Sequence, residues 1–167
     1  MLHSMLDARS QGNGSSRPAG GLDPETLAAA QRIRARGCAK VGLVPLHAGL
    51  EVMPTARRLA QAFEALGDKV GILDALSPTA GTKRPGTPRV DDGPTALQRA
   101  LGDSSARFAR VLVAFGAQAV ADPAASLLYA LDGVVLVARP GGATEFRLHK
   151  WLRRIDPQRQ LGVLLVE

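Results

Sequence analysis

The sequence predicts a doubly wound α/β domain, in which a mostly parallel sheet of about five strands is flanked by helices. Two observations predict it. Short apolar runs alternate along the chain with stretches of helical periodicity. The apolar runs are continuous rather than alternating, which is typical of strands that are buried on both faces. With 167 residues, 46% of them hydrophobic, the chain is long enough to bury the core of one such domain.

The pattern divides the chain into a flexible N-terminal arm, residues 1–22, and one α/β domain, residues 23–167. Asp23 is placed to cap the first helix and Pro24 to begin it. The second helix carries an apolar stripe and ends before Gly67. Glycines and prolines mark a loop over residues 77–93. The expected helices cover residues 24–36, 54–66, 94–101, 123–131 and 144–155, and the expected strands cover residues 41–45, 70–73, 111–115, 134–138 and 161–166.

The composition excludes several classes of protein. The single cysteine, Cys38, rules out an internal disulfide framework and a site of the CxxC type. No apolar run is long enough to span a bilayer, and the N-terminus lacks the apolar segment of a signal peptide. We therefore expect a cytoplasmic domain. Its net charge of +6 allows an anionic partner without requiring one.

Four stretches resemble the strands of the ParA/MinD-like P-loop ATPases, and in particular those of the bacterial tyrosine kinases of capsule and exopolysaccharide synthesis. The resemblance covers residues 38–76 and 106–166, and it implies a shortened P-loop NTPase-like fold. The stretches are KVGILDA from Lys69, FARVLVA from Phe108, LDGVVLVAR from Leu131 and LGVLL from Leu161.

The same resemblance implies that the nucleotide site has degenerated. The family's phosphate-binding Lys falls on Val52 and its Thr on Met53, and Gly49 is the one loop glycine that remains. The metal-facing Asp of the third strand falls on Ala114, whereas Asp74 at the end of the second strand is retained. We therefore expect neither nucleotide nor cofactor to bind and no ATPase or kinase activity.

The loop after the first strand also contains His47 and Glu51, two residues able to act in acid–base chemistry or to bind a metal. A zinc site needs three or four such ligands, so an ordinary loop histidine is the preferred interpretation, and no metal is expected. Asp74 alone is interpreted as a loop or helix cap. An enzyme that uses His47, Glu51 and Asp74 together remains the alternative of a different class.

The last predicted helix carries a basic patch made of Arg147, Lys150, Arg153 and Arg154. The spacing of residues 147, 150 and 154 places three cations on one helical face. The patch is either a solvated helix face or a contact for an anionic membrane, a polyanion or an acidic protein. With 4% aromatic residues, base stacking is not favoured, which argues against nucleic acid as the partner.

The resemblance and the lost motifs together suggest a non-catalytic relative of the exopolysaccharide tyrosine kinases. Such a chain would act as a regulatory or scaffolding subunit with polysaccharide synthesis and export proteins or with a related kinase, alone or as an oligomer. The alternative is a ParA/MinD-like partner in positioning or segregation, which contacts a membrane or DNA through its basic residues. Either role is compatible with a peripheral location at the inner membrane.

Overall fold

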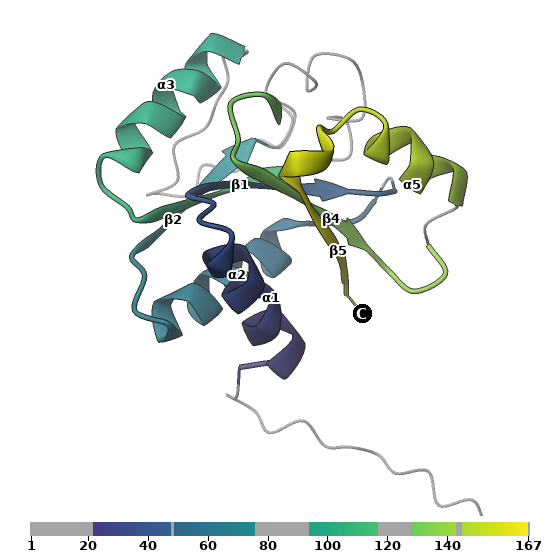
Figure 1. Ribbon diagram of the computed structural model, residues 1–167, viewed down its shortest axis with the longest axis horizontal. Helices are drawn as coiled ribbons and strands as arrows, with labels where there is room; N and C mark the ends of the chain where they lie inside the picture. Colours follow the sequence, from purple (N-terminus) through teal and green to yellow (C-terminus); the bar gives the residue numbers. More distant parts are fainter. Residues whose placement is uncertain (1–21, 48, 76–93, 117–127, 143–144, 167) are drawn as a thin grey trace, which may run out of the picture.

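The computed structural model describes residues 22–47, 49–75, 94–116, 128–142 and 145–166. These residues form a five-stranded parallel sheet with helices on both faces, which confirms the predicted fold class (Figure 1). The strands are β1 (Lys40–Pro45), β2 (Val70–Ala75), β3 (Arg110–Phe115), β4 (Gly133–Ala138) and β5 (Gln160–Leu165). The helices are α1 (Pro24–Ala35), α2 (Met53–Ala65), α3 (Pro94–Ser105), α5 (Glu145–Leu152) and the short 3-10 helix η2 (Pro157–Arg159).

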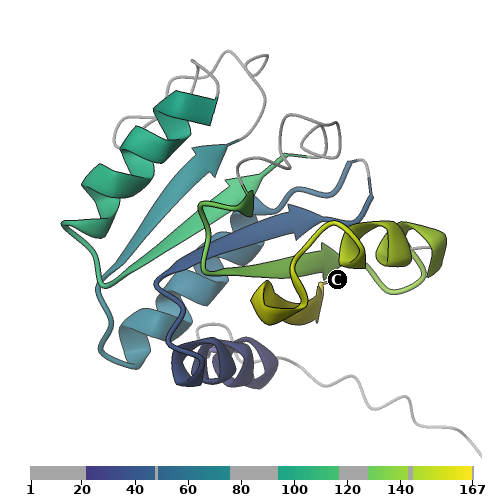
Figure 2. The same cartoon turned by 45° about the horizontal axis from the view of Figure 1, so that its top comes forward.

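The strand order is β2-β3-β1-β4-β5, so β1 lies at the centre of the sheet. The register places Leu43 of β1 beside Ala114 of β3 on one side and beside Val135 of β4 on the other. After its first residue β1 is buried throughout, as is β3, and all of β4 is buried, which explains why these strands have no polar alternation. Because the strands are parallel, their carboxyl ends lie at one edge of the sheet, where the loop after β1 begins (Figure 2).

Each face of the sheet has its own hydrophobic cluster. Ile33 of α1 and Phe63 of α2 belong to the cluster on one face. Leu101 of α3 and Trp151 of α5 belong to the cluster on the other face, and Figure 1 shows the two pairs of helices on opposite sides of the sheet. The stripe predicted for α2 therefore does face the sheet, and Trp151 of α5 packs against the other face.

The ends of the first two helices follow the predicted signals. Gly37 and Gly67 adopt the left-handed backbone, with φ of 71° and 87°, directly after the ends of α1 and α2. Asp23 occupies the N-cap of α1, but its side chain makes no hydrogen bond to the backbone of the first turn. It accepts one from the Thr26 hydroxyl instead, at 2.9 Å.

Two predicted helix ends were wrong. The helix predicted to stop at residue 101 continues through Gly102 to Ser105, because the glycine is exposed and Leu101 and Ser104 on either side are buried. The helix predicted to reach residue 155 ends at Leu152. The next residues form a turn instead, in which the N–H groups of Arg154 and Ile155 both donate to the Trp151 carbonyl, and Asp156 then caps η2.

The prediction that every strand is buried on both faces was wrong for the two outer strands, since β2 is only partly buried and β5 is more exposed still. Val163 and Leu165 are 44% and 58% exposed. The reason is that β5 is the last strand in the order and pairs within the sheet with β4 alone.

Three predicted segments lie mainly or entirely outside the described residues, namely the arm over 1–22, the loop over 77–93 and the helix over 123–131. Within the described part of the chain, no helix combines the length and the apolar character needed to cross a bilayer.

Candidate functional site

The loop between β1 and α2 lies at the carboxyl edge of the sheet, where doubly wound folds bind their ligands. Its first residue, Leu46, continues the pairing of β1 with β4 by donating its N–H to the Val137 carbonyl at 2.9 Å. The end of β3 lies on the other side of β1. The loop therefore lies at the carboxyl ends of the three central strands, β3, β1 and β4.

The side chains of this loop that point into the fold are apolar. Leu46 is 2% exposed, Leu50 is 5% exposed and Val52 is fully buried. Val52 belongs to the hydrophobic cluster that also contains Leu43 of β1 and Val137 of β4. The position that the family resemblance assigns to a phosphate-binding Lys is thus part of the hydrophobic core.

The start of α2 offers few groups for gripping an anion. Val52 is its N-cap residue and provides no side-chain cap, and half-buried Met53 is the first helical residue. Pro54 follows and has no backbone N–H. Gly49 is exposed, with φ of 80°, so it forms a single left-handed turn. Phosphate loops use several closely spaced glycines to direct successive N–H groups toward the phosphate oxygens.

His47 connects the loop after β1 with the loop after β4. Its Nε2 accepts a long hydrogen bond of 3.4 Å from the backbone N–H of Arg139. The imidazole also lies against Gly142, where an added Cβ would be 2.9 Å from Nε2. The sequence placed His47 in the correct loop but gave no sign of these two contacts, because Arg139 and Gly142 follow a different strand.

The remaining polar candidates are not gathered around His47. Glu51 is exposed, whereas Asp74 is half-buried at the end of β2, in register with the fully buried Ala114 of β3. Because β3 lies between β1 and β2, Asp74 is two strands away from the loop that holds His47 and Glu51, about 10 Å across the sheet. The strand order therefore does not favour a catalytic trio of these residues.

Metal binding finds little support in the part of the chain that the structure describes. There, no three residues of the types His, Cys, Asp and Glu lie close enough to hold a metal ion. At Ala114, where the resemblance places a metal-facing carboxylate, the side chain is a methyl group that has no oxygen to donate.

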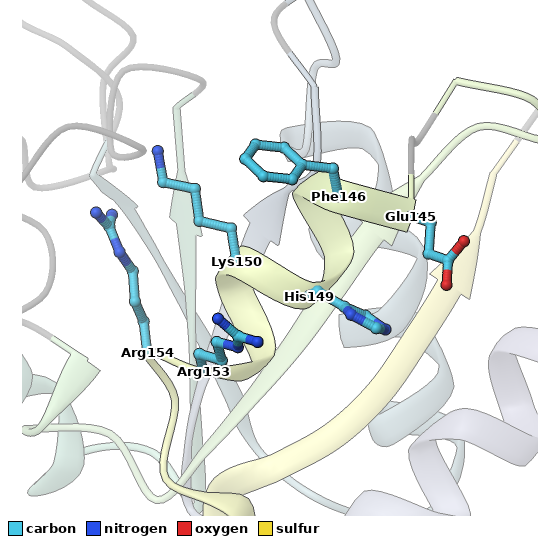
Figure 3. Close-up of a pocket in the computed structure, with 6 residues that line it drawn as sticks. All are labelled: Glu145, Phe146, His149, Lys150, Arg153 and Arg154. Atoms are coloured by element: carbon cyan, nitrogen blue, oxygen red, sulfur yellow. The ribbon is translucent and has the colours of Figure 1, made fainter.

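The four residues of the basic patch lie on α5 and the turn that follows it, and Figure 3 shows Lys150, Arg153 and Arg154. Figure 3 shows Lys150 and Arg154 extending in the same direction, with the ring of Phe146 near Lys150. That ring is 78% exposed. Since α5 ends at Leu152, Arg154 lies beyond the helix, and the single helical face predicted for three cations was wrong in this detail. The patch residues, all exposed, are Arg147, Lys150, Arg153 and Arg154.

Arg34 of α1 and Arg36, the C-cap residue of that helix, have structural partners that the sequence did not reveal. Arg34 donates to the carbonyl of Leu66 at 2.8 Å and lies 3.8 Å from an Asp68 oxygen. Arg36 donates to the carbonyl of Gln160 at 2.6 Å. These side chains tie α1 to the end of α2 and to the start of β5, so they do not extend the basic patch.

The opposite edge of the sheet is held by polar side chains, of which Arg110 and Asp68 are half-buried and Asp132 is exposed. Arg110 pairs with Asp68 at 2.6 Å, donates to the Cys38 carbonyl and lies over the Phe63 ring. Asp132 accepts the backbone N–H groups of residues 39 and 40 at 2.9 and 2.8 Å. Burial, with the nearby Asp132 as the second cause, raises the pKa of the Cys38 thiol. Together these contacts form a structural clamp at this edge.

These features define the class of the fold. It is a shortened α/β domain of the P-loop NTPase-like kind, with a five-stranded parallel sheet and an apolar loop between β1 and α2. The sequence matches no protein-family model and no curated protein. Among solved structures, the chain is similar to the BceF tyrosine kinase domain, with a TM-score of 0.62 and 16% identity over 84% of this chain and 73% of that one.

Two further structures have the same fold. The chimerical protein CapA2B2 gives a TM-score of 0.66 at 13% identity, over 90% of this chain and 86% of that one. The kinase domain of the Escherichia coli tyrosine kinase ETK gives a TM-score of 0.61 at 14% identity, over 83% of this chain and 74% of that one. The chain therefore has the fold of the bacterial tyrosine kinase domains, as the resemblance in its strands implied.

Proposed function

We propose that this chain is a non-catalytic relative of the bacterial tyrosine kinases and acts as a regulatory or scaffolding subunit in polysaccharide synthesis or export. The fold shared with tyrosine kinase domains supports the relationship. The full burial of Val52 among core residues carries the proposal that the chemistry is lost. A side chain that is part of the core cannot at the same time contact a nucleotide phosphate.

The energetics of phosphate binding point the same way. A charge-assisted hydrogen bond from a Lys contributes about 1.5–3 kcal/mol, and a valine at that position contributes none. Phosphoryl transfer also depends on Mg²⁺ to neutralise charge, and the methyl group of Ala114 supplies no ligand for it. Pro54 removes one of the N–H groups that a helix N-terminus directs toward an anion.

Isothermal titration calorimetry with Mg·ATP and with Mg·ADP tests the loss of nucleotide binding. A bacterial tyrosine kinase domain with an intact phosphate loop is the positive control. We expect heat of binding from the control and none from this chain at matched concentrations. Magnesium-dependent binding in the micromolar range would refute the proposal.

Affinity capture tests the scaffolding role. The bait is the full chain, and the matched control is the variant Lys150→Glu/Arg153→Glu, which removes proteins captured by the basic patch alone. We expect polysaccharide synthesis or export proteins, or a related kinase, to be recovered with both baits. Recovery of none of these proteins would contradict the role.

A second candidate function is peripheral membrane contact through the basic patch, as a positioning or segregation partner would make. The specific observation in its favour is Phe146, which is 78% exposed and lies near Lys150 on the helix that carries the basic patch (Figure 3). Aromatic side chains insert at the level of lipid headgroups while basic side chains attract anionic lipids. Duplex DNA would use the cations and leave the ring without a role.

Co-sedimentation with vesicles distinguishes the second candidate. Binding to vesicles containing phosphatidylglycerol, absent from purely zwitterionic vesicles, should be lost in Lys150→Glu/Arg153→Glu and weakened in Phe146→Ser. The control Arg107→Glu changes an exposed charge outside the patch and should bind like the parent chain. Salt-sensitive retention on DNA without vesicle binding would favour a segregation role instead.

A further inference from the structure

The outer edge of β5 is an apolar strand edge that the rest of the described chain leaves open. Val163 is 44% exposed and Leu165 is 58% exposed, although both are large aliphatic residues. Natural proteins usually blunt such an edge with charges, prolines or a covering element, because an open edge pairs readily with another strand.

The hydrogen-bonding groups that β5 presents at this edge can be assigned to particular residues. Val166 donates its N–H inward, to the Ala138 carbonyl of β4, at 2.8 Å. Because peptide groups alternate along a strand, the N–H and C=O groups of Leu165 and Val163 point outward. A register shift occurs opposite Val134 and Val135, and the pairing is regular from Gly162 onward. The open part of the edge is therefore short and regular.

The exposed face of α1 lies along the same edge, and its residues could pack against the same face of a second copy of the chain. Glu25, Ala28, Arg32 and Ala35 of α1 line a groove together with residues 163–165 of β5. Their spacing places them on one side of the helix. The face thus has an acidic residue toward one end, a basic residue toward the other and small side chains beside each of them.

We propose that β5 and α1 form a symmetric dimer interface with a second copy of this chain. A two-fold axis at Leu164 would run the two β5 strands antiparallel and join the two sheets into one. Val163 would then face Leu165 of the partner subunit, and two such hydrogen-bonded pairs would form, each exchanging both of its main-chain bonds.

The two-fold axis also explains the charges on α1. It reverses the helix, so that Glu25 faces Arg32 of the partner subunit, and this pair occurs twice. Ala28 lies between them on this face, and its small side chain allows the helices to approach. An isologous interface must be complementary to itself, and opposite charges placed on either side of an axis meet that requirement. The start of the edge is not available to a longer strand, because Arg36 already binds the Gln160 carbonyl.

Sedimentation velocity over a concentration series tests the dimer. We expect the full chain to be dimeric in the micromolar range and Leu165→Lys to weaken the dimer at least about tenfold. The matched control Phe146→Lys also replaces an exposed apolar residue by lysine, but on α5, and should dimerise like the parent chain. A parent chain that stays monomeric at a few hundred micromolar would overturn the proposal, even if its edge binds another protein.

A charge swap provides a test that does not touch the sheet. Glu25→Arg alone and Arg32→Glu alone should each weaken the dimer, because like charges then meet across the axis. The double variant Glu25→Arg/Arg32→Glu should restore it. Since both side chains are exposed, folding should be unchanged, which circular dichroism checks. Single variants that dimerise as well as the parent chain, or a double variant that fails to recover, would overturn the arrangement.

Discussion

The imidazole of His47 occupies the space that a side chain at position 142 would need. A Cβ added to Gly142 would lie 2.9 Å from Nε2 of His47 and 3.3 Å from the Arg139 carbonyl oxygen. The loop after the central strand is therefore packed against the loop after β4, and the glycine makes this approach possible.

The first prediction concerns this contact. Gly142→Ala should push the His47 ring aside, since the imidazole end of the side chain can shift more easily than the backbone. We expect a displaced imidazole signal in NMR spectra and a loss of no more than about 1 kcal/mol in the free energy of unfolding. In a His47→Ala background the same change should lower the free energy of unfolding by less, because the imidazole that the new methyl group would contact is absent. Equal costs in both backgrounds would contradict the packing.

Sequence patterns were sufficient to predict the strands and the faces of the helices. The runs that became β1, β3 and β4 are buried, and the stripe with Leu59 and Phe63 lies against the sheet. These features depend on local periodicity and burial, which a sequence records directly. The identity of Val52 was also plain, although its full burial in the core needed the structure.

Features that depend on the relative position of distant segments could not be predicted. The His47–Gly142 contact joins two loops that follow different strands, and no periodicity reports it. The exposure of Leu165 depends on β5 being last in the strand order, because its apolar sequence resembles that of a central strand. The partner of Arg36 is likewise a backbone carbonyl far along the chain.

The second prediction concerns Gly102, which interrupts the pattern of α3 without ending the helix. Among the described residues, no atom outside its own helix lies within 4 Å of an added Cβ, so alanine should fit without conflict. We expect Gly102→Ala to raise the free energy of unfolding by about 0.5–1 kcal/mol, because glycine loses more conformational freedom than alanine when the chain folds into a helix. Urea denaturation measures the change. A destabilised variant would show that the helix does not continue through this residue.

The third prediction concerns Arg110 at the opposite edge. Arg110→Met should remove the 2.6 Å ion pair with Asp68 and leave this half-buried carboxylate to the more distant Arg34, 3.8 Å away. We expect a loss of at least about 2 kcal/mol in the free energy of unfolding. The neighbouring Arg107 is exposed, so Arg107→Met should change stability by less than about 0.5 kcal/mol. Similar effects of the two variants would show that the clamp contributes little.

The fourth prediction concerns the pH dependence of stability from Cys38. Burial raises the pKa of this thiol, so the folded chain favours the neutral form more strongly than the unfolded chain does. Its contribution to stability is complete below the ordinary thiol pKa of about 8.5 and declines as the pH rises through the raised folded value. Compared with Cys38→Ala, the parent chain should therefore lose stability more steeply above that pH. Parallel curves would contradict the shift.

The last prediction concerns the residue on which the loss of catalysis depends. Val52→Lys restores the residue type that a phosphate loop uses, but it places an ammonium group in the hydrophobic cluster around Leu43 and Val137. We expect the free energy of unfolding to fall by about 3 kcal/mol or more, without any gain of Mg·ATP binding.

The adjacent residue provides the control, because Glu51 is exposed and the change Glu51→Lys adds the same side chain one position earlier. That variant should keep its stability within about 0.5 kcal/mol, which chemical denaturation can resolve. If Val52→Lys instead folds as stably as Glu51→Lys and binds Mg·ATP, the lysine side chain must extend out of the core and contact a phosphate group. The loop would then be a phosphate site that lacks a single residue, and the apolar packing of Val52 would not be what prevents nucleotide binding.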